Sequence, residues 1–134
     1  MASNITLRTD GPHSPQYRAE VEDALAECAR VLCYATRESA GGLVSPADAD
    51  RLLDALCAAA GMLPQLLTQV SAFLAVKAAS GRLGDDSGRD PEVLADAAAL
   101  HLEVASARFA EATRALEKAQ QIVSGLSVKG DGDA

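Results

Sequence analysis

The chain has no tryptophan and only two tyrosines and two phenylalanines among its 134 residues. Alanine and leucine supply most of its apolar residues, which make up 49% of the chain. These two residues favour helices, whereas the β-branched and aromatic residues that favour strands are scarce. The composition therefore predicts an all-α protein.

Basic charge is also in short supply. Three lysines and nine arginines face 19 acidic residues, which gives a formal net charge of −7. Binding to nucleic acid or to an anionic membrane surface requires clusters of basic side chains. We therefore expect no nucleic-acid partner, and an anionic membrane surface is disfavoured.

Cysteine is present in an odd number, as Cys28, Cys33 and Cys57, without a Cys-x-x-Cys pair. The first fifteen residues lack a basic-then-apolar secretory signal, so we expect reduced thiols in the cytoplasm. Structural zinc usually requires a closely spaced cysteine knuckle. The sequence predicts no metal and no cofactor, and the cysteines are expected to pack as small apolar side chains.

Three segments begin with a capping residue followed directly by proline, the favoured start of a helix: Ser14-Pro15, Ser45-Pro46 and Asp90-Pro91. Glycines follow each segment, and the expected helices are about 26, 35 and 34 residues long. Short connections between long helices predict an antiparallel up-down bundle of three helices. We expect one domain over residues 14–125, with a flexible arm at 1–13 and a disordered tail at 126–134.

The second helix carries its apolar residues in two rows. The first row advances in steps of three and four and includes Leu63, Leu66, Val70 and Phe73, which we predict to form the core. A flanking row contains Leu53, Ala60, Leu67 and Leu74. Pro64 lies within this pattern, so we expect one helix kinked at Pro64. A break at residues 61–63, which would give four helices, remains the alternative.

The third helix has a main apolar row with large and small residues alternating over its last two-thirds: Leu94, Ala98, Leu102, Ala105, Phe109, Ala112, Leu116, Ala119 and Val123. Small residues at alternate positions let two helices approach closely. A second apolar face in the first half contains Val93, Ala97, Leu100 and Val104.

Charge is absent from residues 55–76, which is long enough to span a bilayer. Pro64, Gln65 and Gln69 at its centre and the missing aromatic belt disfavour a membrane span. A helix without charge around its whole circumference is typical of one buried nearly all round. Its least apolar face either stays modestly solvated under alanine, glutamine and serine or meets another chain. The predicted interface comprises Val31, Tyr34, Met62, Gln65 and Gln69.

Two other functions remain open. His101 lies beside the main row of the third helix, where it could serve a catalytic or ligand-binding bundle, although the sequence supplies no partner for it. The segment Tyr34-Ala-Thr-Arg-Glu38 resembles the Tyr-x-x-x-Asp/Glu signal of helical-hairpin substrates of actinobacterial type VII secretion. That resemblance implies an accessory or substrate of a secretion or conjugation apparatus, but the Trp-x-Gly turn of those substrates is absent.

The segments VLCYATRES, GMLPQLLTQVSAFL and SGRLGDDSGRD resemble those of small all-helical proteins from high-GC actinobacteria, some associated with mobile elements. The resemblance implies an all-helical domain and brings no activity or site residue. We therefore predict a non-enzymatic helical bundle that acts by protein–protein interaction, with a second copy or another helical protein as its partner.

Overall fold

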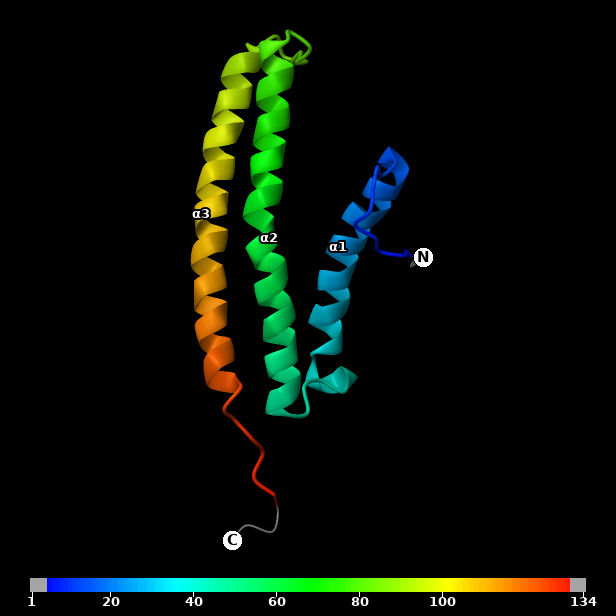
Figure 1. Cartoon of the computed structure of the whole chain (residues 1–134), viewed down its shortest axis with the longest axis vertical. Coiled ribbons are helices and arrows are strands. Elements are labelled where there is room, and N and C mark those ends of the chain that lie inside the picture. The colour runs from blue at the N-terminus through cyan, green and yellow to red at the C-terminus, as the bar shows by residue number, and fades with distance from the viewer. Residues whose placement is uncertain (1–4, 131–134) are drawn as a thin grey trace. The chain divides into compact units, whose positions relative to one another are not determined.

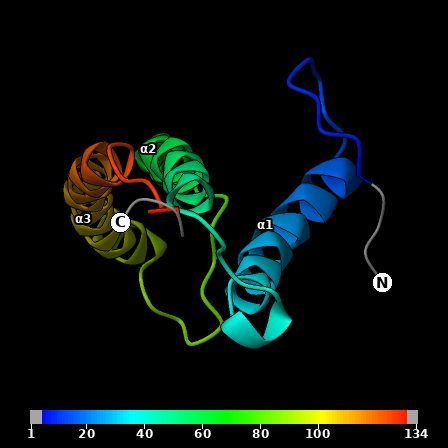
Figure 2. The ribbon, with the colours of Figure 1, turned by 90° about the horizontal axis from the view of Figure 1, so that it is seen from below.

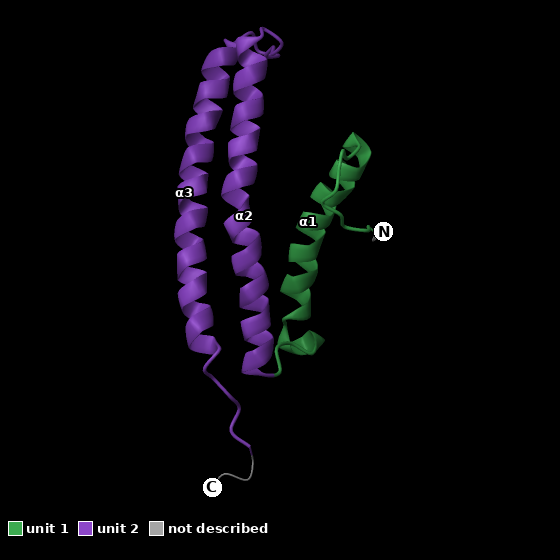
Figure 3. Ribbon diagram, viewed as in Figure 1, with its two compact units in different colours: residues 1–44 green, residues 45–134 purple. Residues whose placement is uncertain are grey.

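The computed structural model describes residues 5–130, and within that range the regular structure is entirely helical. Its elements are α1 (Pro15–Ala35), a short 3-10 helix η1 (Glu38–Ala40), α2 (Pro46–Ala79) and α3 (Pro91–Val123) (Figure 1). The predicted all-α class is confirmed. Contacts divide the chain into two compact units, residues 1–44 and 45–134 (Figure 3). The single domain over residues 14–125 stays a prediction.

The three helix starts are those predicted from the sequence. The hydroxyl of Ser14 accepts a hydrogen bond from the Tyr17 N–H at 3.0 Å, and Asp90 caps α3 in the same way through the Glu92 N–H at 3.0 Å. Ser45 and Asp48 form a reciprocal capping box at the start of α2. These bonds satisfy main-chain donors that the first turn of a helix leaves without partners.

Helix α1 is shorter than predicted. It ends at Ala35, and Thr36 closes it with a side-chain hydrogen bond to the Leu32 carbonyl at 2.9 Å. The main-chain N–H of Thr36 donates to the same carbonyl at 3.1 Å. The double glycine that we expected to end the helix follows η1 instead, with Gly41 at φ 100° and Gly42 at φ 56°.

Helix α2 is one continuous helix of 34 residues that includes Pro64. The alternative of two helices broken at residues 61–63 is therefore wrong. Gly81 follows it at φ 69°, and the N–H groups of Gly81 and Arg82 donate to the carbonyls of Ala78 and Lys77. This pair of bonds is the Schellman ending, which requires a left-handed residue that glycine adopts without strain.

Helices α2 and α3 lie side by side as an antiparallel hairpin (Figures 1 and 2). The loop between them is held by Asp85, whose carboxylate accepts two hydrogen bonds from the Arg89 guanidinium at 3.1 Å and others from Ser87. The Arg89 and Ser87 hydrogen bonds hold the pKa of Asp85 well below its usual range. The predicted polar loop is thus organised around the Asp85 carboxylate, which already accepts hydrogen bonds from Arg89 and Ser87.

Residues 126–130 have no regular structure, and residues 131–134 of the predicted tail lie outside the described range, as do residues 1–4 of the predicted arm. The described part of the arm contacts α1. The Tyr17 hydroxyl accepts a hydrogen bond from the Arg8 N–H at 3.1 Å and donates one to the Thr6 carbonyl at 3.0 Å. These bonds fix residues 6–8 beside the start of α1.

Candidate functional site

The contact between α2 and α3 uses the row of α2 that the sequence ranked second. Its members recur in steps of four and three, and all are half-buried or buried; we call them the seam row: Leu53, Cys57, Ala60, Pro64, Leu67, Ser71, Leu74 and Ala78. This spacing averages 3.5 residues, which keeps a straight row facing a neighbouring helix. Most of the main row predicted for α3 is half-buried; Ala112 is exposed.

The predicted core row of α2 lies elsewhere; we call its large members the outer row: Leu56, Leu63, Leu66, Val70 and Phe73. Phe73 is 57% exposed, Leu66 49% and Val70 47%, so the prediction that they form the core is wrong for this chain; Leu63 is half-buried. The outer row lies about 60–100° around the helix from the seam row. A helix packed on a single neighbour covers only one of two such rows.

A hydrogen bond identifies the two sides of the hairpin. The Gln120 side-chain amide donates a hydrogen bond to the Asp54 carboxylate at 3.4 Å. Gln120 directly follows Ala119 of the main row of α3, and Asp54 directly follows Leu53 of the seam row. In an antiparallel pair, residues that follow the seam meet on one side and residues that precede it meet on the other. Val70 precedes a seam position, so the outer row lies on the side opposite the Asp54–Gln120 bond.

Helix α3 also leaves its second apolar face uncovered. Val93, Leu100 and Val104 are 62%, 65% and 57% exposed. Among residues 5–130 the only apolar residues classed as buried are Ala78 and Ala95, and no large side chain is fully buried. The hairpin therefore exposes extended apolar surface on both of its helices.

The five residues predicted for an interface are all exposed, with Met62 at 65% and Tyr34 at 62%. Met62, Gln65 and Gln69 share one stretch of α2 next to the outer row. Val31 and Tyr34 belong to α1, in the other unit, and the Arg37 guanidinium lies 5.7 Å from the Tyr34 ring centre. Their role in an interface stays a prediction. The outer row was missed as a surface because its periodicity is also that of a core.

Helix α2 is long and apolar enough to cross a membrane, with a mean hydropathy of 1.4 over its most apolar 18 residues. None of the residues in that window is buried. Packing against α3 half-buries the seam row, so it does not explain the absence of charge on the other faces of α2.

The residues considered for chemistry lie apart from one another. His101 is exposed on α3, and across residues 5–130 no three His, Cys, Asp or Glu side chains gather closely enough to hold a metal ion. Cys28 and Cys33 are exposed, contrary to the expected packing, whereas Cys57 is half-buried in the seam row. Burial, followed by the nearby carboxylates of Glu117 and Asp54, raises the pKa of the Cys57 thiol.

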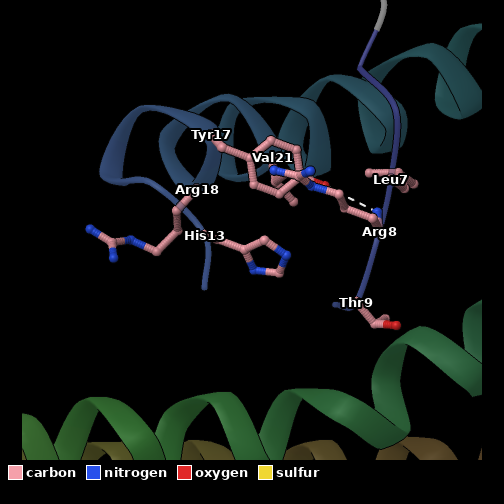
Figure 4. Close-up of a pocket in the computed structure, with 7 residues that line it drawn as sticks. All are labelled: Leu7, Arg8, Thr9, His13, Tyr17, Arg18 and Val21. Carbon is pink, nitrogen blue, oxygen red and sulfur yellow. Dashed lines mark hydrogen bonds between the residues drawn. The ribbon is translucent and has the colours of Figure 1, made fainter. Parts of the chain in front are cut away.

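The N-terminal unit contains a cavity of about 650 Å³, lined by residues of the arm and of the first two turns of α1: Leu7, Arg8, Thr9, His13, Tyr17, Arg18 and Val21 (Figure 4). The Arg8 guanidinium carbon lies 5.1 Å from the centre of the Tyr17 ring, and the His13 ring lies 4.9 Å from it. This cavity was not predicted, because its walls meet only when the arm binds Tyr17.

No protein-family model, curated protein or solved structure matches this chain.

Proposed function

We propose that this protein is a non-enzymatic interaction module that self-associates through the outer row of α2. The observation that carries the proposal is the exposure of Leu66, Val70 and Phe73 on a helix without charge over residues 55–76. Exposed apolar surface of this extent on a soluble chain marks an interaction site.

Charge supports a second copy as the partner. Two chains that each carry a net charge of −7 repel one another, and contact is least costly where no carboxylates are opposed. The charge-free stretch of α2 is such a place. An isologous contact brings this stretch against itself, so that no like charges meet at its centre.

Geometry supports the same partner. The outer row extends from Leu56 to Phe73, about 25 Å along the helix axis. One helix face of this length buries too little area for a stable contact, which requires about 1,000 Å² in total. Val104 of α3 lies on the same side of the hairpin, so two hairpins that meet there form a four-helix bundle with a wider contact.

The test is the molar mass of the untagged protein, measured by light scattering after size-exclusion chromatography over a hundredfold concentration range. We expect a dimer or larger assembly. Phe73→Glu replaces the only aromatic side chain of the outer row with a carboxylate, which Lys77 beside it offsets only in part, and should raise the dissociation constant by more than about 100-fold. Gln69→Glu, at the edge of the row, should weaken assembly less.

Ala75→Glu is the matched control, because it adds the same charge to an exposed position on the opposite side of α2. It should leave the mass unchanged. A wild-type monomer at every concentration would refute self-association. Flotation of the wild-type protein with neutral phosphatidylcholine vesicles, abolished by Phe73→Glu, would identify a membrane as the partner instead.

A further inference from the structure

The cavity of the N-terminal unit has the size of a small-molecule site. Its volume of about 650 Å³ lies within the range of 300–1,000 Å³ that such sites occupy, and it is open to solvent, because five of its seven lining residues are exposed. The arm is held against α1 by both hydrogen bonds of the Tyr17 hydroxyl, to the Arg8 N–H and the Thr6 carbonyl. The walls therefore have a defined shape without a ligand.

The lining is basic although the whole chain is acidic. Of its seven residues two are arginines and one is histidine, and none is acidic. The Arg8 guanidinium and the His13 ring approach the same Tyr17 ring, at 5.1 Å and 4.9 Å (Figure 4). Two nitrogen-rich groups around one ring are placed to donate hydrogen bonds to a single anion.

Local carboxylates do not occupy this donor set. Arg18 pairs with Glu22 at 3.4 Å, but both side chains are about two-thirds exposed, so the pair is weak and readily exchanged. The interactions of Arg8 are with Tyr17, through its main-chain N–H and through its guanidinium above the ring. A guanidinium in this position retains its hydrogen-bond donors for a carboxylate or a phosphate.

The remaining lining residues are mostly apolar. Val21 lies next to the Tyr17 ring and Leu7 extends from the arm, and both offer a surface to a hydrocarbon group (Figure 4). We propose that this cavity binds a small organic anion, with its phosphate or carboxylate at Arg8 and His13 and its apolar body against Leu7, Tyr17 and Val21. The site is separate from the outer row of α2 and does not depend on self-association.

The test is a nitrogen-15 NMR titration of the full chain with hexyl phosphate, followed at the amides of residues 7–9 and 17–21. We expect saturable shifts confined to these residues. Inorganic phosphate and hexanol, each of which supplies half of the proposed ligand, should each bind at least about tenfold more weakly.

Arg8→Gln removes the guanidinium but keeps the main-chain N–H that anchors the arm to Tyr17, and should weaken hexyl phosphate binding at least about tenfold. Arg114→Gln on α3 removes the same charge outside the cavity and should leave the affinity unchanged. An absence of saturable shifts up to about 10 mM, or equal affinity in wild type and Arg8→Gln, would overturn the proposal.

Discussion

Helix α2 carries two apolar rows that look alike in the sequence, yet only one packs on α3. The seam row alternates large residues such as Leu53 and Leu67 with small ones such as Ala60 and Ala78. The predicted row that contains the outer row has one small residue, Ala59, between Leu56 and Phe73. Because α3 presents many alanines to the contact, a row with small residues at several of its positions lets the two helices approach closely.

The two rows differ in exposure. The seam row holds the hairpin together, whereas the outer row has no partner among the residues of α3 that form the seam. A chain of this size normally buries large side chains in a core. Here Phe73, Leu66 and Val70 of α2 remain accessible.

The largest expected effect separates the two rows directly. Leu67→Asp places a carboxylate in the half-buried seam and should destabilise the hairpin by more than about 3 kcal/mol. Val70→Asp, three residues along on the outer row, should leave the isolated hairpin helical and instead abolish assembly. Far-UV circular dichroism during thermal unfolding, at a concentration below the assembly range, measures the contrast. Equal loss of helix in both variants would show that the rows are not distinct.

A smaller effect is expected in the reactivity of the cysteines. Cys57 in the seam row is half-buried and its pKa is raised, so little of it is thiolate near neutral pH, whereas Cys28 and Cys33 are exposed to the reagent. Iodoacetamide should therefore modify Cys57 several-fold more slowly in the folded protein, as measured by peptide mass spectrometry over time. The three rates should converge in denaturant. Faster modification of Cys57 in the folded state would mean that the seam opens readily.

The smallest effect concerns the loop that joins the two helices. Hydrogen bonds from Arg89 and Ser87 lower the pKa of Asp85 in the folded state. The ionised carboxylate therefore stabilises the folded state relative to the unfolded state. Its contribution is present above the unfolded pKa, near pH 4, and is lost as the pH falls through the lower folded value. Asp85→Asn should lower the melting temperature slightly at pH 7, and this difference should shrink at pH 3. A difference that does not change with pH would assign the effect to the hydrogen bonds alone.

Local features of the fold were readable from the sequence. Ser14, Ser45 and Asp90 each satisfy main-chain donors at a helix start, and this chemistry depends on residues within one turn. The end of α1 at Ala35 was missed, because no glycine or proline marks it in the sequence. Gly41 and Gly42 were the stronger signal for a helix end in the sequence, but they follow η1 and not α1.

The sequence by itself determined that the chain is helical, where α2 and α3 begin, and that the centre of α2 carries no charge. These properties follow from propensities, capping and composition, which act locally. Only the tertiary structure decided that Leu67 lies in the seam and Val70 outside it, and that the arm closes a cavity on Tyr17. Two rows with helical spacing are equivalent until the residues of a second helix select the one whose side chains fit.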